Sequence, residues 1–301
     1  MLAVTFGACA PAKKIVPIDT EQSIQIIPAQ NVWVNVPPQK EVIEGYVDVE
    51  GARLWYWDTG GEGVPIVLVH PVSGSALIWG YQQPEFVDAG FRVIAYSRRG
   101  HHGTQVSVTG KMPSASADLL EIAKHLKLEK FHVVGMGGGA GLLSDFAISY
   151  PERLLSLVIG CTIGETGDEG YTSSNNTLLP REFWGLPAWL KELGPVYRDS
   201  NPTGVQEWIA LEEQSSSERI RAPRQNDLKP SSLKEIDLPV LLFTGDADLY
   251  MPPSRLRSFS TYWKNPEMAI FLEAGHAPYW EQPIGFNNVV LDFMKRHNGE
   301  H

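Results

Sequence analysis

Cysteines, long apolar runs and basic clusters are all scarce in this sequence of 301 residues. The two cysteines, Cys9 and Cys161, are too few for a disulfide framework and lack the paired spacing of a zinc site. No apolar stretch approaches the ~20 residues that a membrane-spanning helix needs, so we predict no transmembrane span. The 25 basic residues form no long run and are outnumbered by 35 acidic ones, which argues against nucleic acid as a partner.

What the chain does contain is an ordinary globular composition, with 43% apolar and 20% charged residues. Its N-terminus, "MLAVTFGACAPAKK", resembles the end of a bacterial lipoprotein signal, although the charged segment is missing and the apolar run is short. Cys9 is either an incidental cysteine or the lipidated residue of a signal that starts upstream, which leaves a cytoplasmic and an envelope location both open. We interpret residues 1–44 as a signal-like or extended arm, because 13–40 show no period.

From Gly45 onward, apolar strands alternate with helical patterns. We predict a strand pair turning at Glu50-Gly51, then buried strands in "VPIVLVH", "FRVIAYS", "KFHVVG" and "LLSLVIGCT". Helical patterns follow in "SALIWGYQQPEFVDAG", "SASADLLEIAKHLKL" and "AGLLSDFAISYPERL". This alternation predicts an α/β fold with a mostly parallel sheet and helices on both faces.

The alternation of apolar strands and helices stops after residue 164 and resumes at 237. Residues 165–236 hold no convincing strand, but they contain short helical patches such as "PAWLKELG" and "GVQEWIALEEQ". We interpret them as an inserted helical cap that divides a core of residues 45–164 and 237–301. "LPVLLFTGDAD", "EMAIFLEAGH" and the final helix "FNNVVLDFMKRH" then complete the sheet and its cover.

The stretch "HVVGMGGGAG", residues 132–141, combines a buried strand, a knot of glycines and the start of a helix. Such a corner presents one atom at a sheet edge, yet its apex, Gly137, has no side chain. Glycine relieves the strain of a tight apex, which costs an ordinary residue ~1–3 kcal/mol. Glycine therefore suits the backbone of this turn but supplies no nucleophilic atom, because a residue without an Oγ cannot form an acyl-enzyme.

Five motifs in order resemble those of the α/β-hydrolase superfamily, over roughly Gly45 to His297. They are "VLVHPVSGSALIW", "YSRRGHHGT", "GMGGG" at the place of the nucleophile elbow G-x-S-x-G, "FTGDADLYMPP" and "EAGHAPYWEQP". The resemblance implies an α/β-hydrolase sheet in which glycine replaces the elbow serine.

Carried over by position, the resemblance implies that His276 is the catalytic base and Asp248 its acid partner, with Asp246 as a competing acid. It also implies an oxyanion hole of two backbone N–H groups, from Gly138 and Val72, with Pro71 where the family often has glycine.

Other residues compete for the missing nucleophile or for substrate contacts. Cys161, Ser73, Ser75 and Ser144 carry nucleophilic atoms, but burial, loop hydrogen bonding or distance along the helix favours structural roles. Candidates for the substrate pocket lie on loops at the carboxyl edge of the sheet, at the elbow or in the cap. They are His101, His102, Met136, Trp184 and Tyr279, with Trp189, Trp208 and Trp280 as further aromatic candidates.

These features favour an enzyme in which His276, oriented by Asp248, activates water against an ester, lactone or other activated carbonyl, or cleaves a C–C bond. The alternatives are a cofactor-free lyase or oxygenase, a ligand-binding protein without catalysis, and a serine hydrolase whose nucleophile was replaced by Gly137. We predict a small apolar or carbonyl substrate and no metal or organic cofactor. "GMGGGA" matches a dinucleotide-binding pattern only loosely, without an acidic ribose partner. The substrate's identity and the oligomeric state do not follow from the sequence.

Overall fold

A computed structural model describes residues 24–107, 112–162, 178–215 and 220–299. These residues build a mostly parallel sheet of ten strands in the order β1-β10-β9-β8-β7-β4-β5-β3-β2, with β6 paired to β3. The strands are β1 (Ile24–Ile27), β2 (Ile43–Val49), β3 (Ala52–Asp58), β4 (Pro65–Val69), β5 (Arg92–Tyr96), β6 (Gln105–Val106), β7 (Phe131–Met136), β8 (Leu154–Gly160), β9 (Val240–Gly245) and β10 (Glu267–Phe271). The pairs β2–β3, β3–β5 and β3–β6 are antiparallel and the other neighbouring strands pair in parallel, which confirms the predicted fold class.

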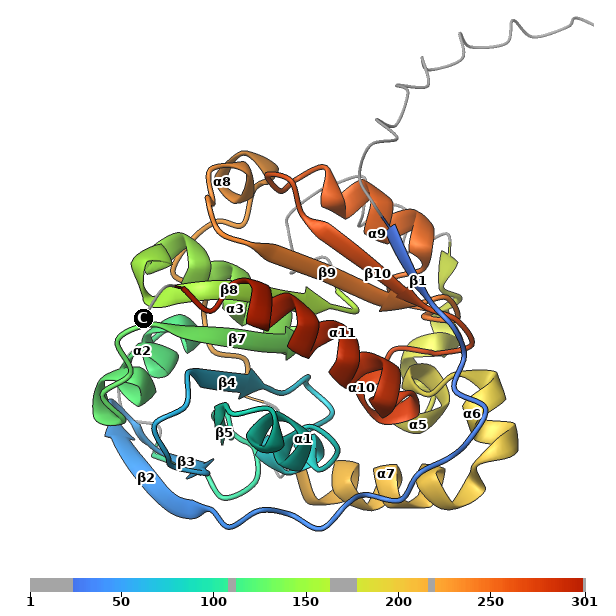
Figure 1. Cartoon of the computed structure of the whole chain (residues 1–301), viewed down its shortest axis with the longest axis horizontal. Coiled ribbons are helices and arrows are strands. Elements are labelled where there is room, and N and C mark those ends of the chain that lie inside the picture. Colours follow the sequence, from blue (N-terminus) through green and yellow to red (C-terminus); the bar gives the residue numbers. More distant parts are fainter. Residues whose placement is uncertain (1–23, 108–111, 163–177, 216–219, 300–301) are drawn as a thin grey trace, which may run out of the picture.

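Helices cover both faces of the sheet. Successive strand residues point to opposite sides, so buried strands with continuous apolar runs present an apolar face on each side. On β7, Val133 packs in one apolar core and Val134 in the other. The core that contains Val133 lies under α2 (Ala115–His125), α3 (Gly138–Ser149), α8 (Pro230–Lys234) and α9 (Pro253–Ser260). The other lies under α1 (Gln83–Asp88), α10 (Pro278–Glu281) and α11 (Pro283–Arg296), as Figure 1 shows.

One predicted helix is wrong in its length. Residues 75–90 were predicted as a single helix, but they form a 3₁₀ turn, η1 (Ala76–Trp79), and then the short α1. Pro84 lies at the start of α1, where its missing N–H does no harm, although it could not lie inside a longer helix. The strand pair that turns at Gly51 is confirmed, and φ is +71° at that glycine.

The described part of the N-terminal arm, from residue 24 onward, is anchored to the sheet. Residues 24–27 form β1, which pairs in parallel with β10 at one edge of the sheet. The chain then crosses to β2 at the opposite edge, and the Tyr81 hydroxyl donates to the Val34 carbonyl along the way at 2.8 Å. The sequence gives little sign of this strand, because "IQII" is only four residues long. Its partner β10 lies more than 240 residues away in the sequence, so no local pattern links the two. Cys9 lies outside the described residues.

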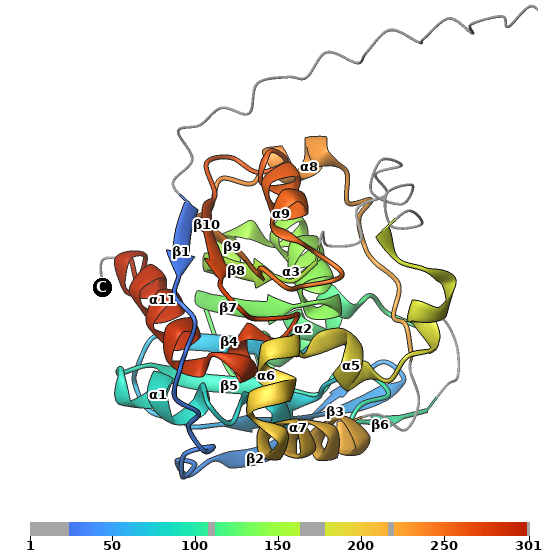
Figure 2. The ribbon, with the colours of Figure 1, turned by 90° about the vertical axis from the view of Figure 1, so that its right-hand side faces the viewer.

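Helices occupy the described part of the chain between β8 and β9. They are η3 (Arg181–Gly185), α5 (Ala188–Glu192), α6 (Pro195–Ser200), α7 (Pro202–Ser215) and α8. Figures 1 and 2 show α5, α6 and α7 beyond the carboxyl ends of the parallel strands. Trp208 of α7 is buried in the core shared with α11, so this insertion is packed against the sheet domain. Within the described ranges, no helix is long and apolar enough to cross a membrane.

Candidate active site

The turn between β7 and α3 is the centre of the site. Gly137 precedes the first residue of α3 and adopts φ 53° and ψ −124°. Side chains disfavour a positive φ, and the glycine has no Cβ to be strained. Its N–H donates to the Gly160 carbonyl of the neighbouring strand at 3.1 Å, which fixes the turn at the carboxyl edge of the sheet.

The missing side chain of Gly137 would point directly at His276. A Cβ built on Gly137 would lie 3.5 Å from the His276 Nε2 atom and 3.2 Å from the Cβ of Pro71. A hydroxyl one bond further on would reach hydrogen-bonding distance of Nε2. The space in front of this imidazole nitrogen is therefore the space that a nucleophile's side chain would take.

His276 is held from behind by Asp248. The imidazole Nδ1 lies 3.0 Å and 2.9 Å from the two carboxylate oxygens of Asp248, which is 2% exposed. The carboxylate is itself held by the backbone N–H groups of Tyr250 and Met251, at 2.8 Å and 3.1 Å. Asp246, the competing acid of the sequence analysis, is exposed, and the carboxylate bonded to the imidazole is that of Asp248. Hydrogen bonding from Nδ1–H to the carboxylate leaves Nε2 as the proton acceptor.

The charges around His276 favour its protonated form. Burial alone lowers the pKa of this imidazole, but the carboxylates of Asp248 and Glu192 outweigh burial, and the pKa is raised above its usual value. Glu192, at the end of α5, was not predicted from the sequence. Its backbone carbonyl accepts from the His276 N–H at 2.6 Å, and its side chain accepts from the Ser73 hydroxyl at 2.6 Å.

A second residue missed by the sequence analysis, Glu281, organises the loop that carries His276. Its fully buried carboxyl group accepts from the N–H groups of Gly275 at 3.0 Å and Ala277 at 3.2 Å, on either side of His276. It also accepts from Gly194 of the insertion at 2.7 Å. Burial raises the pKa of Glu281 to about 7 despite these donors. One carboxyl group thus joins the histidine loop to the helices above it.

Replacing Glu281 by glutamine should make the protein's stability less sensitive to pH. The pKa of the wild-type carboxyl group is about 7 in the folded protein, against an ordinary value of 4.5 for an exposed glutamate in the unfolded chain. The folded state therefore binds the extra proton between these values, and the wild-type unfolding free energy falls as pH rises through this window. The shift is equivalent to about 3 kcal/mol at ~1.4 kcal/mol per pKa unit.

Urea unfolding at pH 5 and pH 8 measures this effect. Between pH 5 and pH 8, we expect the unfolding free energy of Glu281→Gln to rise relative to that of the wild type by up to about 3 kcal/mol. Glu85→Gln changes an acid on α1 outside this network and serves as the control. Parallel pH curves for the wild type and Glu281→Gln would contradict the assignment.

The predicted amide donors line a common cavity. Gly138 is the first residue of α3, so its N–H has no acceptor within the helix and points toward the helix's N-terminal end. A Cβ built on Gly138 would lie 2.7 Å from Cγ2 of Val72, and both residues line one cavity of about 600 Å³. The structure thus brings Val72 and Gly138 together beside the turn, although their role as donors stays a prediction.

The four alternative nucleophiles have structural partners. Ser73 donates to Glu192, and Ser75 caps η1 by accepting from the Leu77 N–H at 3.3 Å. Ser144 donates within α3 to the Ala140 carbonyl at 2.9 Å. Cys161 is buried behind Asp248, and burial raises the pKa of its thiol well above its usual range. A thiol held protonated is a poor nucleophile.

Cys161, Asp248 and His276 are also the described residues that come closest to a metal site. Their ligand atoms all lie within 4.8 Å of one another, and all three side chains are buried. A metal ion there would have to replace the hydrogen bond between Asp248 and His276 and deprotonate the Cys161 thiol. The donors of this group are already committed to one another.

Two of the predicted pocket residues lie beside the turn. His101 is 5% exposed and lines the same cavity as Val72 and Gly138. Met136 ends β7 next to Gly137 but is buried in the apolar core. Its place in the sheet explains why it packs rather than lines a surface.

The other three lie away from that cavity. His102 stacks edge-on with Trp55 and lines a separate groove near α7. Tyr279 is 1% exposed and packs against Trp79 in the core. Trp184 is 58% exposed, and its ring contacts Phe183 and Tyr250. The predicted aromatic pocket is therefore divided between core packing and surface contacts, although the ring of Tyr250 packs at an angle of 45° against His276, with ring centroids 4.5 Å apart.

The strand order, the turn after β7 and the pairing of His276 with Asp248 define a protein of the α/β-hydrolase class. The sequence model of the alpha/beta hydrolase family matches residues 66–289, and the chain belongs to this family. Its membership makes it a hydrolase-like enzyme.

Individual relatives are distant but cover most of the chain. A 2-hydroxy-6-oxononadienedioate/2-hydroxy-6-oxononatrienedioate hydrolase from Paraburkholderia phymatum is 26% identical over 285 residues, covering 84% of this chain and 93% of that protein. The dihydrolipoyllysine-residue acetyltransferase component of an acetoin cleaving system from Pseudomonas putida is 28% identical, covering 83% and 69%. A thermophilic esterase from Thermogutta terrifontis shares the fold, with a TM-score of 0.68, 21% identity and coverage of 85% and 99%.

Proposed function

We propose that this chain hydrolyses an ester, lactone or other activated carbonyl compound by general-base catalysis, without a covalent intermediate on the protein. The observation that carries the proposal is the space next to His276. Nδ1 of His276 lies against the Asp248 carboxylate, and the position facing Nε2 is Gly137, whose absent Cβ would lie 3.5 Å from that nitrogen. A water molecule or a substrate oxygen fits where a nucleophile's side chain would otherwise lie.

In the reaction that we propose, Nε2 of His276 takes a proton from water as the water oxygen attacks the carbonyl carbon. The C=O π electrons move to the carbonyl oxygen, and the N–H groups of Gly138 and Val72 stabilise the resulting oxyanion. When this tetrahedral intermediate collapses, the bond to the leaving oxygen breaks and the imidazolium returns its proton to that oxygen. The Asp248 carboxylate stabilises the imidazolium between the two proton transfers.

Two further features support hydrolysis. One similar protein is named a hydrolase and one solved structure with the same fold is an esterase. The helices α5, α6 and α7 lie over the carboxyl ends of the strands, and we propose that residues 165–236 act as a cap that limits water around the carbonyl. Glu281 and Glu192 fix this cap to the loop that carries His276.

Installing a serine at Gly137 should create a nucleophile that the wild-type chain lacks. We expect a fluorophosphonate probe to leave the wild type unlabelled and to add one adduct to the Gly137→Ser variant, measured by intact-protein mass spectrometry. Activated esters should show a pre-steady-state burst only in the variant. Because φ is +53° at this position and Pro71 is close, the variant should also lose about 1–3 kcal/mol of unfolding free energy.

The proposed function stands if the wild type turns over members of a panel of activated esters and lactones without a burst. The Gly137→Ser, His276→Ala double variant is the control, and it should take up no probe. Turnover confined to Gly137→Ser would overturn the proposal, because the frame would then be a hydrolase lacking its nucleophile. Labelling of a wild-type residue that turnover requires would overturn it as well.

A further inference from the structure

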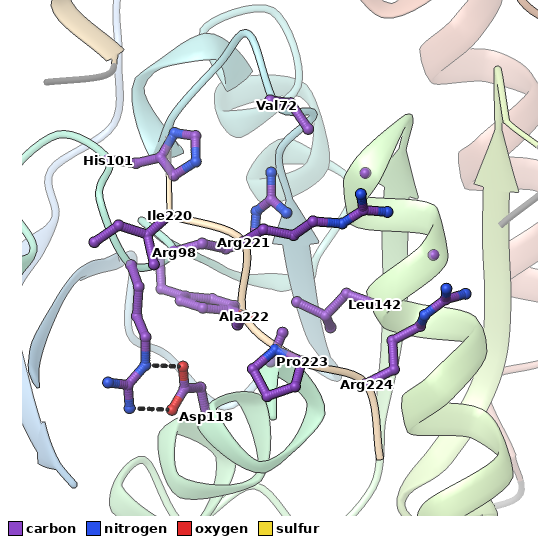
Figure 3. A pocket seen from close by; sticks show the side chains of 15 residues that line it. Val72, Arg98, His101, Asp118, Leu142, Ile220, Arg221, Ala222, Pro223 and Arg224 are labelled. Atoms are coloured by element: carbon purple, nitrogen blue, oxygen red, sulfur yellow. Dashed lines mark hydrogen bonds and ion pairs between the residues drawn. The ribbon is translucent and has the colours of Figure 1, made fainter. Parts of the chain in front are cut away.

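The cavity of about 600 Å³ beside the turn after β7 has a composition that the proposed reaction does not explain. It begins at Val72 and Gly138 and follows α3 as far as Leu142. Its other side is formed by the start of α2, including Asp118, and by residues 220–224, which precede α8. Figure 3 shows that segment crossing in front of α2 and α3.

The lining of this cavity is strongly basic in an acidic protein. Among the described lining residues there are four arginines against one acid, and these charged residues are Arg98, Arg99, Arg221, Arg224 and Asp118. The chain as a whole has a net charge of −10, so this gathering of arginines is a local feature. Positive charge gathered in a cleft raises the local concentration of anions.

The single acid belongs to the cavity's wall. Asp118 accepts from Nε of Arg99 at 2.7 Å and from Nη2 at 2.8 Å, and both side chains are buried. Arg99 also donates to the Glu50 carbonyl at 2.7 Å. This pair anchors the β5–β6 loop to α2 and neutralises the charge of Asp118 within the wall of the cavity.

Arg98 places a guanidinium group beside the reaction centre. A Cβ built on Gly138 would lie 3.5 Å from Nη1 and 3.7 Å from Nη2 of Arg98, so this charge lies next to the N-terminal end of α3. The Arg98 backbone is fixed as well, because its N–H donates to Nε2 of His70 at 3.0 Å. Burial and then the charge of Arg98 lower the pKa of His70 well below its usual range, which keeps that acceptor nitrogen unprotonated.

Arg221 and Arg224 approach from the opposite side. Both are exposed, and Figure 3 shows their side chains extending from the 220–224 segment toward α3. Between the arginines the lining is apolar, with Leu142, Ile220 and Pro223 available to contact a carbon skeleton. A helix N-terminus, planar guanidinium groups and apolar side chains together suit a small organic anion.

We propose that this cavity binds a carboxylate group of the substrate, so that the enzyme acts on carbonyl compounds that also carry a carboxylate. Arg98 and Arg221 hold the carboxylate, while the reacting carbonyl lies at Gly138 in front of His276. The placement of the carbonyl rests on the proposed function, whereas the binding of the anion does not. A binding measurement can therefore fail or succeed independently of turnover.

The first test measures binding by isothermal titration calorimetry. The probes are 4-phenylbutyrate, its neutral amide 4-phenylbutyramide, and inorganic phosphate. We expect the wild type to bind the carboxylate, with an affinity that falls as the NaCl concentration is raised. The amide and phosphate should bind at least tenfold more weakly, a difference that corresponds to roughly one charge-assisted hydrogen bond. Arg98→Gln and Arg221→Gln should each weaken carboxylate binding by about 10- to 100-fold and leave the amide unchanged.

Lys130→Gln is the matched control, because it removes the same charge at the amino-terminal end of β7, far from the elbow. Arg221 is exposed, so its variant keeps the test decisive if Arg98→Gln fails to fold. Equal binding of acid and amide, phosphate binding as tight as the carboxylate, or an equal loss in Lys130→Gln would overturn the proposal.

The second test separates the anion site from the proposed reaction. A phenyl ester that carries a free carboxylate is compared with the corresponding neutral methyl diester for kcat/KM. We expect the wild type to prefer the acid, and we expect Arg221→Gln to lower kcat/KM for the acid about tenfold or more but not for the neutral diester. Carboxylate binding without turnover of either ester would retain the anion site and reject only the hydrolysis. An unchanged preference in Arg221→Gln would reject the site.

Discussion

Replacement of His276 by alanine is expected to lower kcat by about 10²- to 10⁴-fold for any ester or lactone that the wild-type chain hydrolyses, because positioned general bases contribute that much. The nearest described side-chain nitrogen or oxygen to the position of Gly137 is Nε2 of His276, 3.5 Å from a Cβ built there. In the proposed mechanism no side chain acts as a nucleophile, so all of the proton transfer depends on this imidazole. Initial rates at saturating substrate measure the loss.

The pH dependence of the same reaction gives a second readout. The proposed mechanism uses unprotonated His276 as the base, so kcat/KM should rise with pH through the pKa of the imidazole, which the nearby carboxylates raise. Asp248→Asn removes the closest of these charges. It should shift the rise of kcat/KM to lower pH and also lower kcat. Asp246→Asn, two residues earlier and exposed, is the matched control and should leave both unchanged. A His276→Ala variant that keeps wild-type turnover would refute the role of the base.

The part of this site that the sequence predicts is the part built from local motifs. Gly137, Asp248 and His276 each follow a strand in a short, recognisable stretch, and parallel strands bring their carboxyl ends to one edge. Asp248 and Asp246 could not be separated by pattern alone. Burial and the hydrogen bond to Nδ1 distinguish them.

The residues that the sequence analysis missed act across long separations. Glu281 contacts Gly194 over 87 positions, and nothing in "HAPYWEQP" marks that carboxyl group as buried. The basic cavity likewise combines Arg98 with residues 220–224, from two loops that show no charge run of their own. For the aromatic residues the error is the opposite one, because Tyr279 and Trp208 are buried in the apolar core instead of lining a pocket.

The buried pair formed by Arg99 and Asp118 should have the largest effect on stability. We expect Asp118→Ala to lower the free energy of unfolding by about 3–5 kcal/mol, because it leaves the Arg99 guanidinium buried without its partner. The exposed pair of Arg53 and Asp48 offers a matched control, and Asp48→Ala should cost less than about 1 kcal/mol. Urea unfolding followed by tryptophan fluorescence measures both changes.

The same pair should nevertheless be replaceable as a unit. Burial outweighs the attraction of Arg99 and leaves the pKa of Asp118 raised, so holding this charge in the interior is costly even with its partner present. An Arg99→Met, Asp118→Leu double variant should therefore recover most of the stability that Asp118→Ala loses. A double variant as unstable as Asp118→Ala would show that Arg99 stabilises the loop mainly through the Glu50 carbonyl. Because Arg98 and His101 lie on that loop, carboxylate binding in a stable double variant would also show whether the ion pair orients the anion site or only supports it.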